Sequence, residues 1–251
     1  MKFLNCPGLE RVTELLSGLI TGTGVVNGKV EAYSEKPIKS DRKLAKSLEH
    51  QYTQEITKGL ITRQGSGSFG SLYEPNNRKT LIKLISTMNH SFPEYDFSSV
   101  REHHFNKENN LSKVQNAINI TLNSCVDDYY PEKAEVIWSE IDDVISLEDC
   151  QVYSYIPGLS EEDPFSQLGV VWSMNYFFVN TKLKRVIYFT TQCISFNSEM
   201  INEQEFEEQN EWFQSENSWN KNEKWSNNSY SYNNNNNNNI EEEETMFDFQ
   251  F

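Results

Sequence analysis

Residues 170–196 read VVWSMNYFFVNTKLKRVIYFTTQCISF, two long runs of aromatic and β-branched residues separated by a short polar turn at residues 180–182. This pattern predicts two strands that form a hairpin. Side chains alternate between the faces of a strand, which puts Trp172, Met174, Tyr176 and Phe178 on one face and Ser173, Asn175 and Phe177 on the other. Because aromatic residues fall on both faces, we expect a central strand that is covered on both sides.

The elements outside this hairpin alternate between helical and extended patterns. Short extended runs at MKFLN (1–5), within TGTGVVNGKVEAYSEK (21–36) and at CQVYSYIP (150–157) predict three more strands. Apolar residues at helical spacing predict helices within residues 7–19, 78–92, 111–125 and 131–149. Together these elements predict an α/β (α+β) fold, with a central, mainly antiparallel sheet of about five strands packed with helices in a single globular domain.

The charge of the chain is concentrated at one end. Of the formal net charge of −15, residues 197–251 carry −11, with thirteen acidic and two basic side chains. This segment also contains seven consecutive asparagines at 233–239, and too few apolar residues to bury a core of its own. We therefore expect a globular domain over 1–196 and a disordered, acidic, Asn-rich tail over 197–251. The acidity argues against direct binding to nucleic acid.

Residues 37–77 interrupt the regular pattern and are predicted to form a mobile insert, with a helix only around residues 42–50. The insert contains GSGSFG at 65–70, which has the spelling of a phosphate-binding glycine loop. However, the flanking strand and helix and the other motifs of a kinase or dinucleotide site are missing from the sequence. The four cysteines and four histidines also have no metal-ligand spacing. We expect no enzyme activity, no catalytic residues, no metal and no cofactor, and no stretch is apolar enough for a membrane span.

The glycines of the insert instead favour a loosened segment that protein kinases can reach. Arg63 stands three residues before Ser66, a spacing that basophilic kinases favour, and Ser68 and Ser71 follow in chain that we expect to be exposed. Each phosphate adds about −1.5 to −2 charges. Ser66, Ser68 and Ser71 are therefore the predicted phosphorylation sites. The alternative is that serine and glycine are simply common in loops.

Several segments, taken in order, resemble a known family. PEYDFSS (93–99) and WSMNYFFVNTKLKRVIYF (172–189) resemble the second and third signature boxes of the Maf-one (Maf1) family, general repressors of RNA polymerase III transcription. MKFLN with GKVEAYSEK (28–36) resembles the first box, and CQVYSYIP and DPF (163–165) fit between the second and third. The likeness covers most of residues 1–196, whereas the insert corresponds to the family only in position and the tail only in acidity.

This resemblance implies a non-enzymatic repressor that binds RNA polymerase III and interferes with its recruitment by the initiation factor TFIIIB. It also implies control by protein kinases and phosphatases, through the insert and through movement between cytoplasm and nucleus. The alternative is a phospho-regulated adaptor whose partner is unrelated to transcription.

The candidate partner-binding residues come from the second and third boxes. They are Tyr95, Asp96, Phe97, Asn175, Lys182, Lys184 and Arg185. For the second box we also weigh a structural reading, in which Tyr95 and Phe97 pack and Asp96 caps the following turn. The basic cluster of Lys182, Lys184 and Arg185 can be a nuclear-import signal or a patch for an acidic partner. The alternative is that it is only the solvated end of the hairpin.

Overall fold

The computed structural model describes residues 1–65, 67–125, 131–158 and 163–197, which all belong to one compact unit, Met1–Ile201. Apart from residue 197, the predicted acidic tail lies outside the described residues. No helix in the described part of the chain is long and apolar enough to span a membrane.

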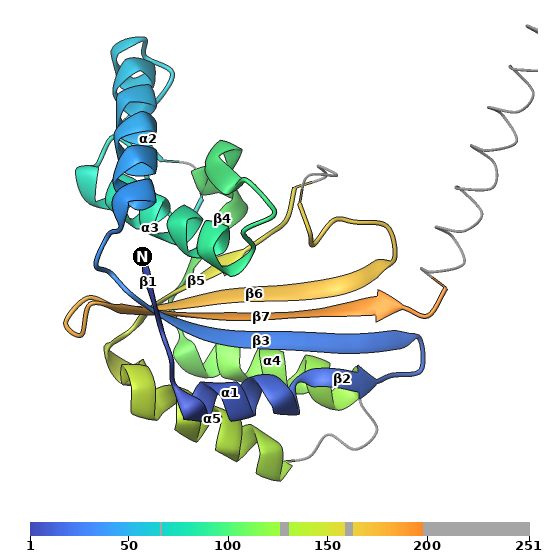
Figure 1. The fold of residues 1–251 in the computed structure, drawn as a ribbon. Helices are drawn as coiled ribbons and strands as arrows, with labels where there is room; N and C mark the ends of the chain where they lie inside the picture. Colours follow the sequence, from blue (N-terminus) through green and yellow to red (C-terminus); the bar gives the residue numbers. More distant parts are fainter. Residues whose placement is uncertain (66, 126–130, 159–162, 198–251) are drawn as a thin grey trace, which may run out of the picture. The chain divides into compact units, whose positions relative to one another are not determined.

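A seven-stranded antiparallel sheet forms the middle of this unit (Figure 1), and its strands follow the order β1-β3-β7-β6-β5-β4, with β2 paired to β3. The strands are β1 (Lys2–Leu4), β2 (Ser17–Ile20), β3 (Gly24–Ser34), β4 (Phe105–Glu108), β5 (Gln151–Tyr155), β6 (Val170–Asn180) and β7 (Arg185–Ser195). The predicted hairpin is confirmed as β6 and β7, and the antiparallel α+β class is confirmed with it.

Two strands were not expected from the sequence. β2 lies where the helical pattern of residues 7–19 was expected to continue, but α1 ends at Leu15 and Ser17 already pairs with Asn27 of β3. Gly18, with a φ of 69°, lies within β2 at a shift in the register of this pairing. β4 reads FNKE, which lacks a clear alternation, and it forms through pairing with β5. β2 thus depends on the strand that follows it directly, and β4 on a strand more than forty residues away.

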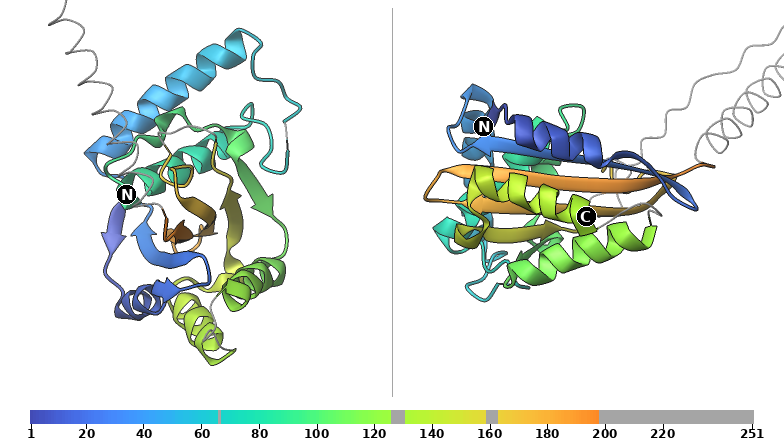
Figure 2. Two further views of the ribbon diagram at one scale, coloured as in Figure 1. Left: turned by 90° about the vertical axis from the view of Figure 1, so that its right-hand side faces the viewer. Right: turned by 90° about the horizontal axis from the view of Figure 1, so that it is seen from below.

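Helices cover both faces of the sheet (Figures 1 and 2). One face packs against α1 (Pro7–Leu15), α4 (Leu111–Cys125) and α5 (Pro131–Ile145), and the other against α2 (Lys39–Thr57) and α3 (Pro75–Ser91). Three short 3-10 helices, η1 (Phe97–Ser99), η2 (Glu102–His104) and η3 (Leu147–Asp149), complete the described elements. The result is a three-layer arrangement with a separate apolar core on each side of the sheet.

The alternating pattern of β6 divides its side chains between these two cores. Trp172, Met174, Tyr176 and Phe178 belong to the core under α1, α4 and α5, and Phe177 and Val179 to the core under α2 and α3. Phe177 stacks on Tyr188 of β7 with ring centroids 4.4 Å apart. The predicted central strand with two covered faces is confirmed.

The insert contains more regular structure than the sequence indicated. Its helix α2 runs over Lys39–Thr57, well beyond residues 42–50, and buries Leu48 and Tyr52 against the core on its side of the sheet. Further along, Phe69 and Leu72 are also buried in that core. The expectation of irregular chain outside residues 42–50 is therefore wrong for α2, because these apolar side chains find a distant surface to cover. Mobility of the insert stays a prediction.

Truncating Phe178, which is fully buried under α5, should destabilise the domain strongly. For Phe178→Ala we expect a loss of about 3–5 kcal/mol in the free energy of unfolding, measured by urea denaturation, because the change leaves a cavity in a packed core. Ile20→Ala is the matched control, since Ile20 is 71% exposed and its truncation should change stability by no more than about 0.5 kcal/mol. Equal effects of the two changes would contradict the packing described here.

A candidate partner-binding region

The segment PEYDFSS forms the turn that leaves α3 and enters η1. The Asp96 carboxylate accepts a hydrogen bond from the Ser98 N–H at 2.9 Å and caps η1, as the structural reading of this box predicted. Phe97 is buried, and its N–H donates to Asn89 Oδ1 of α3 at 2.8 Å. Phe97 is therefore a packing residue, and its assignment as a partner contact is wrong, whereas Asp96 remains exposed.

Tyr95 lies at the border between this packed interior and the surface. Its half-buried ring makes edge contacts with Phe92, and its hydroxyl accepts a hydrogen bond from Gln167 Nε2 at 2.7 Å. Phe92 in turn packs edge-on against Phe165 of the DPF segment, with centroids 5.3 Å apart. The second signature segment and the DPF segment, about 70 residues apart in the sequence, thus meet on one face of the sheet.

A pocket of about 100 Å³ opens where these segments meet. It is lined by Asp96, Phe97, Ser99, Val100, His104, Tyr155, Gly158 and Asp163. The buried Asp163 carboxylate accepts hydrogen bonds from the Tyr155 hydroxyl and from the Phe165 N–H. This carboxylate is thereby held in place by its own segment and by β5.

The ionisable groups of the pocket are tuned for hydrogen bonding. Burial, together with the neighbouring His103, lowers the pKa of His104, so its imidazole is neutral at pH 7. Its Nδ1 accepts the Arg101 N–H at 3.2 Å, which leaves the proton of the neutral ring on Nε2. Burial and the bond to Asp163 raise the pKa of Tyr155, which keeps its hydroxyl protonated as a donor.

The size and chemistry of the pocket limit the kinds of ligand that it can bind. A volume of about 100 Å³ is below the roughly 300–1,000 Å³ typical of small-molecule sites, but it can accept one side chain of a protein partner. Among the described residues, no group of three or more His, Cys, Asp or Glu side chains could hold a metal ion. His104 and Tyr155 were not predicted from the sequence, although the segments PEYDFSS and DPF contribute other residues to the same pocket.

Asn175 has a structural position inside the sheet. It is 2% exposed, and its Oδ1 accepts hydrogen bonds from the Tyr188 hydroxyl at 2.9 Å and from Thr190 Oγ1 at 2.7 Å. Its assignment as a partner contact is therefore wrong. The amide oxygen instead pairs two hydroxyl groups that β7 brings into the core, where an unpaired polar group would be costly.

The predicted basic cluster lies at the tip of the β6–β7 hairpin, but its members have different surroundings. Lys182 and Lys184 are exposed, and Lys182 Nζ donates to Asp149 Oδ1 at 2.6 Å. Arg185 is half-buried, and its guanidinium donates to the Val144 carbonyl at 2.8 Å near the C-terminal end of α5. Arg185 thus caps a helix end, where cations are favoured. The exposed part of the cluster consists of two lysines, of which Lys182 is paired with Asp149.

The hairpin tip and the pocket do not form one site. Ser154 of β5 pairs with Tyr176, so the pocket residue Tyr155 lies beside the middle of β6. The hairpin tip begins after Asn180, about four residues further along the strand, which at about 3.3 Å per residue is roughly 13 Å. A partner that touches both must therefore extend along the domain.

The predicted phosphorylation sites differ in their accessibility. Ser66 lies outside the described residues. Ser68 is exposed, and its Oγ accepts the Lys107 N–H of the edge strand β4 at 2.9 Å. Ser71 is only 8% exposed, and its hydroxyl donates to the Thr62 carbonyl, so the expectation that it is exposed is wrong.

Phe69 explains why this glycine-rich loop is held against the domain. Its ring is buried between Phe105 of β4 and Tyr153 of β5, with centroid distances of 6.1 and 5.7 Å. Gly70 has a φ of 94°, which lets the chain turn directly after this anchor. GSGSFG is thus attached to the sheet edge through its one aromatic residue, between two candidate serines.

Comparison with known proteins agrees with this arrangement. The Maf1 regulator family model matches residues 26–190. A Schizosaccharomyces pombe protein named repressor of RNA polymerase III transcription maf1 is 34% identical over 196 residues, covering 75% of this chain and 81% of the relative. A Dictyostelium discoideum protein named repressor of RNA polymerase III transcription is 31% identical, covering 78% and 85%. A crystal structure of citrus MAF1 aligns with a TM-score of 0.59 at 31% identity, covering 75% of this chain and 97% of that one. The chain belongs to the Maf1 family.

Proposed function

We propose that this protein is a negative regulator of RNA polymerase III transcription, which binds the polymerase and blocks initiation that depends on TFIIIB. The observation that carries the proposal is the likeness to two proteins named as repressors of RNA polymerase III transcription. It extends over 75% and 78% of this chain and over 81% and 85% of those relatives. A likeness of this extent involves a whole domain and not a short motif.

Because much of the signature segments is buried, only some of the candidate residues can contact a polymerase. Phe97, Asn175 and most of the β6–β7 hairpin are interior, so they act by maintaining the fold. The exposed candidates that remain are Asp96 beside the pocket and the two lysines of the hairpin tip. We place the polymerase contacts at these two places, with the half-buried Tyr95 contributing at the pocket.

Control by protein kinases and phosphatases is part of the proposal. Ser66 and Ser68 are the favoured sites, since Ser68 is exposed and its hydroxyl bridges to β4. A phosphate on Ser68 cannot accept the Lys107 N–H in the same geometry, and it adds charge next to the Phe69 anchor. Phosphorylation of Ser71 requires the loop to open first. Repression needs entry into the nucleus, and we propose that phosphorylation holds the protein in the cytoplasm.

Phosphorylation should weaken the binding of purified RNA polymerase III to the full chain. After treatment with a basophilic kinase we expect about a tenfold loss in the amount of polymerase retained in a pull-down, because added negative charge disfavours the contact. Ser66→Ala should largely prevent this loss, and Ser68→Ala should prevent part of it. Ser71→Ala is the matched control, since a buried hydroxyl is a poor kinase substrate.

Two other outcomes of this pull-down would each contradict one part of the proposal. If the phosphorylated chain binds as well as the unmodified one, the role of the insert is wrong while repression stands. If neither form retains the polymerase, the repressor proposal itself is wrong, and the adaptor with a non-transcriptional partner takes its place.

Removing the charges of the two exposed lysines at the hairpin tip should also weaken the contact between this tip and the polymerase. For the double variant Lys182→Gln, Lys184→Asn we expect a loss of roughly three- to tenfold in polymerase affinity, with a reduced dependence on salt. Asparagine is chosen at 184 because Lys184 has a φ of 52°, which asparagine tolerates. Lys113→Gln on α4 is the exposed control and should bind like the unchanged protein. If affinity and its salt dependence are unchanged in the double variant, the tip is not a contact surface.

A further inference from the structure

The outward side of α2 carries a row of positive charges. α2 lies at the outside of its layer (Figures 1 and 2), and it buries Leu48 and Tyr52 on the side that meets the core. Its basic residues follow the spacing i, i+3, i+4, i+7, which brings side chains together on one side of a helix. All of them are exposed. These residues form the basic stripe: Lys39, Arg42, Lys43 and Lys46.

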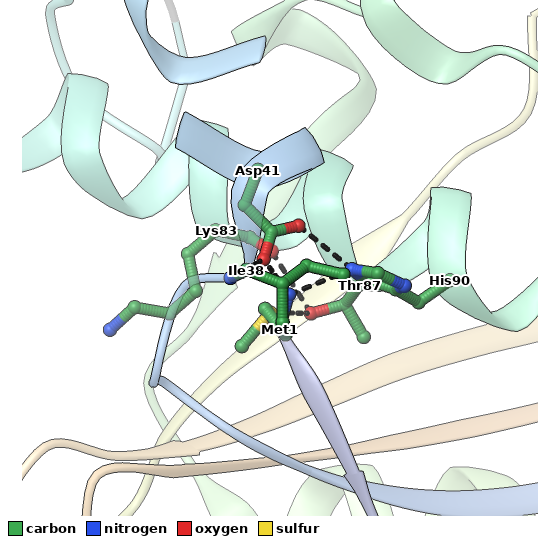
Figure 3. A network of polar contacts seen from close by, with 6 residues as sticks. All are labelled: Met1, Ile38, Asp41, Lys83, Thr87 and His90. Carbon is green, nitrogen blue, oxygen red and sulfur yellow. Dashed lines mark hydrogen bonds and ion pairs between the residues drawn. The ribbon is translucent and has the colours of Figure 1, made fainter. Parts of the chain in front are cut away.

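The carboxylates near this stripe are engaged elsewhere. The Asp41 carboxylate points inward, where it contacts the Met1 amine and His90 Nε2 of α3 (Figure 3). Among the described residues, no member of the basic stripe has an ion-pair partner, so its charges are not compensated within this part of the chain. The two other carboxylates of residues 35–49 pair with cations of α3: Glu35 with Lys83 and Glu49 with Arg78.

The stripe does not stabilise the helix that carries it. Like charges three and four residues apart on a helix repel each other. Lys39 and Arg42 also lie in the first turn of α2, where the helix dipole favours carboxylates over cations. A ligand of opposite charge would relieve both unfavourable effects. The arrangement of these charges therefore points to recognition and not to folding.

A groove between α2 and α3 adjoins the stripe. It has a volume of about 230 Å³, and its lining includes Arg42 and Ala45 of α2 together with Lys79 and Ile82 of α3. Lys79 is exposed and, like Arg42, has no ion-pair partner among the described residues. The groove thus combines aliphatic side chains with one unpaired cation from each helix. Its volume is below that of typical small-molecule sites but is sufficient for one apolar side chain.

We propose that the basic stripe and this groove bind an acidic segment of a protein partner, with one apolar side chain of that segment in the groove. From Lys39 to Lys46 the stripe extends for about 10 Å, at 1.5 Å per helical residue. An extended peptide covers this distance with about three to four residues. The surface is separate from the pocket and the hairpin tip, where the polymerase contacts are placed. The inference therefore does not rest on the proposed repression.

Nucleic acid is the other polyanion that a row of cations can attract. However, residues 1–196 contain 24 acidic and 20 basic side chains, so the stripe is a local exception on an acidic domain. A nucleic acid extends past the stripe and meets that negative charge. A short acidic segment avoids the repulsion, and its apolar side chain also fills the groove. The charge and the shape of the surface together favour a protein segment.

Binding of a labelled acidic peptide to the full chain tests this inference. The probe is a fluorescein-labelled peptide in which one phenylalanine is flanked on each side by four glutamates, and binding is followed by fluorescence anisotropy. We expect the double variant Arg42→Gln, Lys79→Gln to weaken binding about tenfold, with a smaller dependence on salt. Replacing the phenylalanine of the peptide with alanine should weaken its binding to the unchanged protein about fivefold, because the groove is then left empty.

A charge reversal at the start of α2 separates recognition from stability. Lys39→Glu places a carboxylate in the first turn and four residues before Lys43, and both positions favour the helix. We expect this variant to slow hydrogen exchange of the α2 amides about twofold and to weaken peptide binding about fivefold. Damage to the fold would instead speed the exchange. An unchanged peptide affinity in this variant contradicts the proposed role of the stripe.

The matched control removes two charges away from the stripe. Lys58→Gln with Lys113→Gln, both at exposed positions, should keep the peptide affinity within about twofold of the unchanged protein. An equal loss in both double variants overturns the inference, because net charge alone then explains the binding.

A thymidine oligonucleotide with about eight phosphates tests the alternative ligand. If it binds as tightly as the peptide and loses as much affinity in the Arg42→Gln, Lys79→Gln variant, the surface accepts any polyanion and the inference is wrong. Absence of peptide binding to the unchanged chain at low salt also overturns it. Polymerase binding is not the readout, so either failure is distinguishable from a failure of the proposed repression.

Discussion

The burial of β6 and β7 on both faces is the constraint on which the rest of the structure depends. Phe177 stacks on Tyr188 in one core, while Phe178 lies in the other. A strand pair with aromatic side chains on both sides needs a helical layer on each side, and α1, α4 and α5 supply one layer while α2 and α3 supply the other. Two of the polar groups carried inward, on Tyr188 and Thr190 of β7, donate to Asn175. The Thr191 hydroxyl, also on β7, is buried without a hydrogen-bond partner in the described part of the chain.

Because of this burial, many residues of the segments that identify the family have a structural role and do not contact a partner. Much of PEYDFSS and of the hairpin is interior, so these residues maintain the scaffold and leave few side chains for recognition. The exposed features beside them are Asp96 at a small pocket and the lysines at the hairpin tip, which lie at separate places on the domain. A partner recognised in this way meets an extended surface and not a deep cleft. That distribution suits a protein that obstructs a large assembly, which is the function proposed here.

The insert shows how tertiary contacts can impose order on a polar sequence. α2 has few apolar residues, and an isolated helix of this composition is marginal in water. Leu48 and Tyr52 attach it to the core, and the ion pair of Asp41 with the Met1 amine holds its first turn. Beyond the helix, Phe69 attaches the glycine-rich loop to the edge of the sheet. Three small anchors thus hold a segment that local patterns predict to be irregular.

By itself the sequence determined the β6–β7 hairpin, the helical patterns of α3, α4 and α5, and the antiparallel α+β class, because each depends on a local periodicity of apolar residues. The family resemblance followed from the same segments. Only the tertiary structure decided that β4 is a strand, that Ser71, Phe97 and Asn175 are buried, and that the Met1 amine meets Asp41 forty residues away. These features depend on partners distant in the chain, and the pairing of distant residues leaves no period in the local sequence.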